Sequence, residues 1–256
     1  MSDLVLVDTV DRVRTVTLNR PEARNALSVA LQREAGAALA EADGDADVDV
    51  VIFTGTDPAF CAGLDLRELG RDASNLVGGA DDPAISPFAA LWKMSKPVIG
   101  AINGPCVTGG FELALACDFL VASERAAFAD THARVGVMPA GGMSVFLPQV
   151  LGVRKAKEMS LTGNFMSAHE AFARGLVNHV VAHAELLPAA AKLAADIVGN
   201  DQPAVRSLKH LYDANERVTV GDAINQEQET FRAWRIDPAE IERRRTGIVE
   251  RVRDQQ

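Results

Sequence analysis

The sequence predicts an α/β fold followed by a helical C-terminal part. Short apolar segments typical of buried strands alternate with helical segments up to Ala184, and from there onward every regular pattern is helical. The chain has 256 residues, enough for one large domain or two small ones with a buried core. We expect an α/β core over residues 1–195 and a helical region over residues 196–256.

The periodicity of the apolar residues places the elements in order. Apolar runs predict strands at residues 4–8, 13–18, 50–53, 97–102, 119–122 and 178–181. Helical spacing predicts helices at residues 28–39, 64–69, 88–94, 111–117, 147–161 with a break near Gly152, 167–173, 186–198, 203–215, 220–234 and 239–253. Ser28 and Ser167 are the expected N-caps of two of these helices. Residues 70–87 are rich in Gly, Asp and Pro and predict a loop, and residues 128–142 look irregular.

Composition excludes several classes of protein. Charged residues make up 24% and apolar residues 48%, as in an ordinary globular protein, and the net charge of −9 argues against a nucleic-acid surface. Cys61, Cys106 and Cys117 lack the spacing of disulfides or zinc ligands, which suits a reducing cytosol. The sequence has neither a secretory signal pattern nor an apolar run of membrane-spanning length. We therefore expect a cytoplasmic protein without a metal site.

The stretch from Asn103 to Asp118 carries the strongest chemical signal. A buried strand leads into a glycine turn, and Gly109 and Gly110 open a helix with Glu112 in its first turn. Because Gly109 has no Cβ, a substrate oxygen can approach its backbone N–H, with a carboxylate one turn away. In the alternative interpretation, the glycines only form a turn and Glu112 only complements the helix dipole.

A second loop has the same design. The segment Phe60-Cys61-Ala62-Gly63-Leu64-Asp65 follows the strand at residues 50–53 and precedes a short helix. If the two strands that lead into the loops are neighbours, the N–H groups of Ala62 and Gly109 converge on one oxygen. Two such loops predict an oxyanion-binding site more strongly than one.

Short motifs in a fixed order extend this pattern between about residues 13 and 185. They occupy residues 19–21, 25–27, 59–66, 96–99, 103–104, 109–113, 117–118, 136–139, 161–163 and 171–177. In this order they resemble the crotonase superfamily, the enoyl-CoA hydratase/isomerase group. The resemblance implies a spiral of ββα repeats. It also implies a C-terminal helical region that forms trimers, often a dimer of trimers, and covers the active site.

The resemblance also implies an acyl-CoA thioester as substrate, a place in fatty acid metabolism, and no further cofactor. The N–H groups of Ala62 and Gly109 are then expected to bind the thioester oxygen. The segment Ala62, Gly63, Leu64, Asp65 and Leu66 is expected to run along the CoA moiety. Asp65 is interpreted as a helix cap within that segment. Arg24 is a candidate for the CoA phosphates, and the alternative is a solvated loop arginine.

Hydratases of this family use two glutamates across the substrate, one to activate water and one to protonate the α carbon. Glu112 matches the first, but His132 stands where the second is usual. A histidine can exchange protons near neutral pH, so His132 is a candidate catalytic residue. The alternative is a structural role, with His132 bonded to a neighbour such as Asp130.

Other positions also depart from the family pattern. Residues 139–144 differ from the usual glycine-rich run, and the Arg-rich helix around Arg243-Arg244-Arg245 replaces the usual C-terminal motif. These arginines either reach a CoA phosphate across a subunit boundary or form a solvated helix face. The three cysteines are interpreted as small buried hydrophobes.

The first functional hypothesis is an enoyl-CoA hydratase, a lyase that adds water to 2-trans-enoyl-CoA and gives 3-hydroxyacyl-CoA. The second is another crotonase-type reaction, as an isomerase, hydrolase or decarboxylase, with Glu112 as the single carboxylate. The third is a non-catalytic acyl-CoA-binding protein, against which the two loops and Glu112 argue.

Overall fold

The computed structural model describes residues 4–72 and 82–254. The chain divides into two compact units, Met1–Lys209 and His210–Gln256. This division lies within helix α10 (Gln202–Asn215), not at the expected boundary between residues 195 and 196. The start of α10 belongs with the core because Arg206 and Lys209 form ion pairs with Asp49 and Asp118 there.

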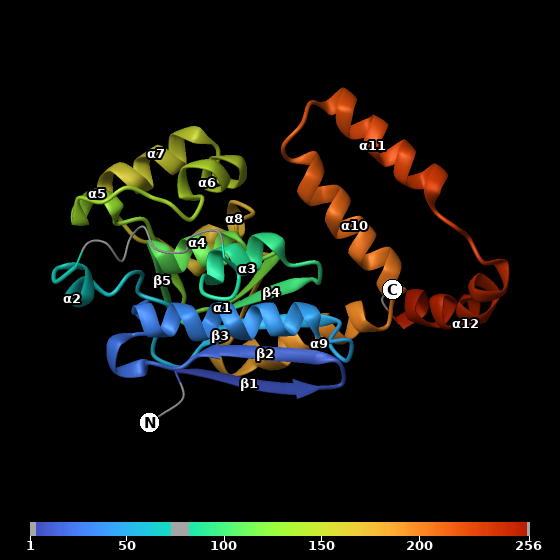
Figure 1. Ribbon diagram of the computed structural model, residues 1–256, viewed down its shortest axis with the longest axis horizontal. Coiled ribbons are helices and arrows are strands. Elements are labelled where there is room, and N and C mark those ends of the chain that lie inside the picture. The colour runs from blue at the N-terminus through green and yellow to red at the C-terminus, as the bar shows by residue number, and fades with distance from the viewer. Residues whose placement is uncertain (1–3, 73–81, 255–256) are drawn as a thin grey trace. The chain divides into compact units, whose positions relative to one another are not determined.

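A six-stranded sheet forms the centre of the first unit (Figure 1). Its spatial order is β1 (Val5–Val10), β2 (Val13–Leu18), β3 (Val50–Gly55), β4 (Val98–Ile102), β6 (Phe119–Ser123) and β9 (His179–Val181). β1 and β2 pair antiparallel, and every further neighbour in this sheet pairs parallel. All six predicted strands are therefore confirmed, with ends that differ by a few residues.

The two faces of this sheet bury different side chains. In β3, Val51 and Phe53 belong to the larger hydrophobic cluster, and Val50 and Ile52 belong to a second cluster. This alternation follows from the two-residue period of a strand. The larger cluster includes residues of α1 (Val29–Gly44), α3 (Pro87–Lys93) and α4 (Gly109–Leu115), whereas α9 (Leu186–Val198) packs in the second.

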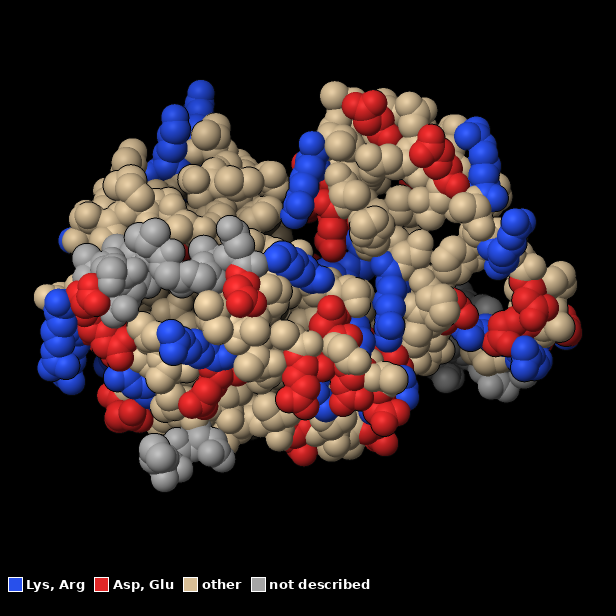
Figure 2. Space-filling view, viewed as in Figure 1, with Lys and Arg blue, Asp and Glu red and all other residues tan. Residues whose placement is uncertain are grey.

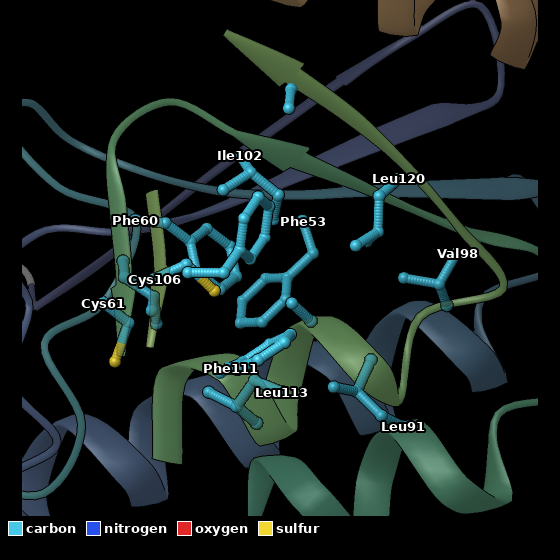
Figure 3. Close-up of a cluster of buried hydrophobic side chains, with 14 of the residues drawn as sticks. Phe53, Phe60, Cys61, Leu91, Val98, Ile102, Cys106, Phe111, Leu113 and Leu120 are labelled. Atoms are coloured by element: carbon cyan, nitrogen blue, oxygen red, sulfur yellow. The ribbon is translucent and has the colours of Figure 1, made fainter. Parts of the chain in front are cut away.

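Aromatic rings of the larger cluster lie directly under the two glycine loops. Phe53 and Phe60 pack edge to face with ring centroids 5.6 Å apart, and Phe111 lies against Phe128 at 5.4 Å. Figure 3 shows Phe53, Phe60 and Phe111 together between the sheet and α4. The start of α4 therefore has a rigid, dry support.

The predicted N-caps have the expected geometry. Ser28 accepts a hydrogen bond from the Leu31 N–H at the start of α1, and Ser167 accepts one from the Glu170 N–H at the start of α8 (Ala168–Ala173). The remaining helices of the first unit are α2 (Leu66–Leu69), α5 (His132–Val135), α6 (Met143–Leu151), α7 (Val153–Thr162) and α8 (Ala168–Ala173). α6 and α7 meet at Gly152, which adopts a φ of 76°, so the predicted break there is confirmed.

A second, small sheet escaped the sequence-based interpretation. It consists of β5 (Pro105–Val107), β7 (Ala127–Ala129) and β8 (Met166–Ser167). None of these strands exceeds three residues, so no two-residue period is visible in the sequence. Long-range pairing alone creates them.

The second unit continues α10 and contains α11 (Val220–Ala233) and α12 (Pro238–Asp254), as predicted. Several of its large apolar side chains are exposed, among them Tyr212, Val220, Phe231 and Ile241. Arg245 of α12 pairs with Glu242 of the same helix at 2.9 Å.

Candidate active site

The two glycine loops leave the sheet side by side. β3 and β4 are parallel neighbours, and a further parallel bridge joins Cys61 to Cys106. The condition for convergence of the two loops is therefore met. A Cβ on Gly63 would lie 3.4 Å from the Gly109 nitrogen, so the two turns touch.

The backbone of Ala62 is not available for a substrate. Its N–H donates to the carbonyl oxygen of Arg24 at 3.0 Å. The prediction that Ala62 supplies an oxyanion donor is therefore corrected, because this donor already has a partner within the protein. The loop at residues 19–25 uses it to anchor the glycine loop.

The backbone nitrogen that lies beside Gly109 belongs to Leu64. Leu64 bridges Leu27 in parallel, with bonds from the Leu27 N–H to the Gly63 oxygen and from the Asp65 N–H to the Leu27 oxygen. The Leu64 N–H therefore points away from Leu27 and has no acceptor within residues 4–72 and 82–254. A Cβ on Gly109 would lie 3.7 Å from the Leu64 nitrogen. Successive N–H groups along this bridge point in opposite directions, and this alternation in the folded chain distinguishes Leu64 from Ala62.

Glu112 is 4% exposed and held by the segment that begins α6. Its Oε1 accepts the N–H groups of Gly141 and Met143 at 2.7 and 3.2 Å. Burial raises the pKa of Glu112 above its ordinary value, and outweighs the opposing effects of these N–H groups and of His132. The second oxygen, Oε2, lies 3.7 Å from Nε2 of His132.

His132 has the structural partner that the sequence suggested, and its other ring nitrogen lies near Glu112. Its Nδ1 lies 2.6 Å from Oδ1 of Asp130, so the structural partner is present, while Nε2 faces Glu112. Burial tends to raise the pKa of Asp130, but hydrogen bonds from His132 and Ser160 hold that pKa below its usual value. The ionised Asp130 thus favours a proton on Nδ1 and leaves Nε2 toward the site.

The other residues predicted to bind CoA are Asp65, Leu66 and Arg24. Asp65 caps α2 by accepting the N–H groups of Arg67 and Glu68, and binds Arg20 at 2.5 Å, so its interpretation as a helix cap is confirmed. Arg24 and Leu66 are exposed. The predicted loop that precedes α3 includes residues 73–81, which lie outside the described part of the chain.

Comparison with known proteins agrees with this geometry. A family model described as enoyl-CoA hydratase/isomerase matches residues 8–254. The chain belongs to the enoyl-CoA hydratase/isomerase family. It is 40% identical to a protein named probable enoyl-CoA hydratase 1, peroxisomal, from Arabidopsis thaliana, over 87% of this chain and 83% of the relative.

Solved structures of the family share the fold. A crystal structure of enoyl-CoA hydratase from Mycobacterium smegmatis superposes with a TM-score of 0.76 at 54% identity, over 91% of this chain and 98% of that one. A carnitinyl-CoA dehydratase from Escherichia coli is 37% identical over 81% of this chain and 79% of the relative. The predicted crotonase fold with its helical C-terminal region is thus confirmed, and the chain is a crotonase-fold acyl-CoA enzyme.

Acidic and basic side chains lie interspersed on the face that Figure 2 draws. Within the described residues, no helix combines the length and the apolar character needed to cross a membrane.

The cysteines beside the site are expected to be chemically inert in the folded protein. Burial raises the pKa of Cys61 to about 12, and it also raises the pKa of Cys106 and Cys117. Because the thiolate is the reactive form, a disulfide-exchange reagent at mildly alkaline pH should label the native protein far more slowly than the protein in denaturant. Rapid labelling of the native protein would contradict this.

Proposed function

We propose that this protein is an enoyl-CoA hydratase that adds water to 2-trans-enoyl-CoA and gives 3-hydroxyacyl-CoA. The observation that carries the proposal is the placement of a buried Glu112–His132 pair around the first turn of α4, which Gly109 begins. The names of relatives that share most of the chain point to the same reaction.

The proposed reaction uses two backbone donors and two side chains. The N–H groups of Leu64 and Gly109 hold the thioester oxygen, on which negative charge develops in the enolate. Glu112 takes a proton from water as the water oxygen bonds to the β carbon. The electron pair of the double bond moves into the enolate. The proton that Glu112 took from the water is then returned to the α carbon through Nε2 of His132 or through a water, so that one H and one OH are added in total and both side chains are restored. One water is consumed, with no net oxidation, so we expect no redox cofactor.

Asp130 supports this role of His132. Its carboxylate bonds to Nδ1 of His132 and so fixes the orientation of the ring, as the aspartate does in the Ser-His-Asp triad. At 3.7 Å, Nε2 of His132 and Oε2 of Glu112 are too far apart for a hydrogen bond, so both remain able to face a substrate.

An isomerase, hydrolase or decarboxylase is the second candidate. The observation that favours it is that a histidine, His132, and not a second glutamate lies near Glu112, because a reaction that needs one base does not need His132 as an acid. The proposal also includes a cytoplasmic enzyme and a homotrimer or dimer of trimers. The exposed apolar side chains of α11 and α12 support oligomerisation through the second unit.

The test compares short and medium 2-trans-enoyl-CoA substrates with 3-enoyl-CoA isomers, using wild type, His132→Gln and Asp130→Asn. We expect hydration by the wild type, a loss of about 10²- to 10⁴-fold in His132→Gln, and a smaller loss in Asp130→Asn. A wild type that isomerises the 3-enoyl-CoA and hydrates neither substrate would favour the second candidate. Wild-type turnover in His132→Gln would assign the α proton to water.

A further inference from the structure

Thr108 has a backbone conformation that is unusual for its residue type. It is the single residue between β5, which ends at Val107, and α4, which begins at Gly109. Its φ of 52° and ψ of −111° lie outside the regions that residues with a Cβ ordinarily adopt. A glycine would adopt this conformation freely, so the presence of threonine calls for a reason.

Four hydrogen bonds hold Thr108 in place. Its N–H donates to the Ala129 oxygen of β7 at 2.9 Å, and its carbonyl oxygen accepts the Glu112 N–H at 2.9 Å. Its hydroxyl accepts the Thr131 N–H at 3.1 Å and lies 2.5 Å from the Thr131 hydroxyl. Thr108 is only 7% exposed, so these bonds are shielded from water.

These bonds determine where the next N–H points. In a trans peptide, the C=O and the N–H of the same unit point in opposite directions. Because the Thr108 carbonyl points into the first turn of α4, the Gly109 N–H points out of that turn, and its nitrogen lies beside Gly63. The Gly109 N–H has no acceptor within the described residues. The backbone conformation of Thr108 therefore sets the direction of the Gly109 N–H, which is the proposed oxyanion donor.

Thr131 connects this donor with the proton-transfer side of the site. It stands between Asp130 and His132, whose side chains bond to each other. The hydroxyl pair thus joins the turn before Gly109 to the segment that places His132, although β5 and α5 are separate elements.

We propose that Thr108 and Thr131 are positioning residues. They direct the Gly109 N–H at the thioester oxygen and hold it at a fixed position relative to His132. This inference rests on the proposed function. Neither residue exchanges a proton with the substrate, because both act through the peptide unit between Thr108 and Gly109.

The test uses variants that distinguish the loss of the hydroxyl group from a disturbance of the fold. Thr108→Gly permits the same backbone angles and removes the hydroxyl, Thr131→Val keeps the shape, and Thr108→Ser and Thr131→Ser retain the hydroxyls as matched controls. We expect kcat to fall about 10- to 100-fold in the first two variants, with KM little changed and with wild-type activity in the serine variants. Because both act through one contact, the double variant Thr108→Gly/Thr131→Val should lose little more than either alone.

A second readout reports the oxyanion donor directly. The carbonyl stretch of bound butanoyl-CoA, labelled with ¹³C at the thioester, falls in frequency when N–H groups polarise it. We expect this fall in wild type and in the serine variants, and a smaller fall in Thr108→Gly and Thr131→Val. Wild-type kcat and carbonyl frequency in both of those variants would overturn the inference. If wild type itself does not shift the carbonyl, the proposed oxyanion site is wrong, which is a different outcome.

Discussion

Replacement of Glu112 by Gln should remove most of the turnover and, at neutral pH, make the fold more stable. Gln has the same shape and still accepts the Gly141 and Met143 N–H groups through Oε1, but it cannot take a proton from water. Loss of a general base typically lowers the rate by about 10²- to 10⁴-fold. The buried carboxylate is costly to ionise, and the neutral amide is free of that cost.

The pH dependence gives the sign of the stability effect. The pKa of Glu112 is raised in the folded state, above its ordinary value of 4.5. Folding is therefore favoured while the group is protonated, and this contribution is lost as the pH rises through the raised pKa. We expect the difference in Tm between Glu112→Gln and wild type to be small at acidic pH and to grow in favour of the variant as the pH rises above 4.5.

Thermal unfolding between acidic and neutral pH, together with enoyl-CoA turnover, checks both effects. Glu158→Gln is the matched control, because the Glu158 side chain is 61% exposed on α7 and lies outside the site. The control should keep its activity and show no such pH-dependent gain in stability. A Glu112→Gln variant with wild-type turnover, or with a Tm below that of wild type at neutral pH, would contradict the prediction.

Gly110→Ala is expected to separate the two loops and to destabilise the protein. A Cβ on Gly110 would lie 2.3 Å from the Cys61 carbonyl oxygen and 2.6 Å from the Cys61 Cβ. Neither atom is the end of a flexible side chain, so α4 and the glycine loop must move apart. Overpacking of this kind typically costs about 1–3 kcal/mol of unfolding free energy. Turnover should fall as well, because the two proposed oxyanion donors, the N–H groups of Leu64 and Gly109, would move apart.

Denaturant unfolding and turnover of Gly110→Ala should be compared with those of Gly44→Ala. Gly44 ends α1 and a Cβ there meets no atom within 4 Å, so this control should be neutral or more stable by up to about 1 kcal/mol. If Gly110→Ala unfolds at the same denaturant concentration as Gly44→Ala and retains its activity, the contact with Cys61 is not limiting.

Local patterns in the sequence determined most strands and helices of this protein and two of its candidate site residues. The two-residue period of strands such as β2, the N-caps Ser28 and Ser167, and the four C-terminal helices depend on neighbours in the chain, so the sequence alone predicts them. The repeated strand–glycine–helix design likewise indicates Gly109 and Glu112 from the sequence alone. These features are encoded within a few residues.

Contacts between distant segments of the chain decided which backbone N–H groups are free at the site and which buried polar side chains pair there. The bridge between Leu27 and Leu64, together with the bond from the Ala62 N–H to Arg24, determines that the Leu64 N–H and not the Ala62 N–H lacks an acceptor among the described residues. Likewise, only the folded chain brings His132 to both Asp130 and Glu112, and pairs the hydroxyls of Thr108 and Thr131. The physical reason is the same in each case. The direction of an N–H and the partner of a buried polar group depend on pairing register and on burial, which are set by residues far away in the sequence.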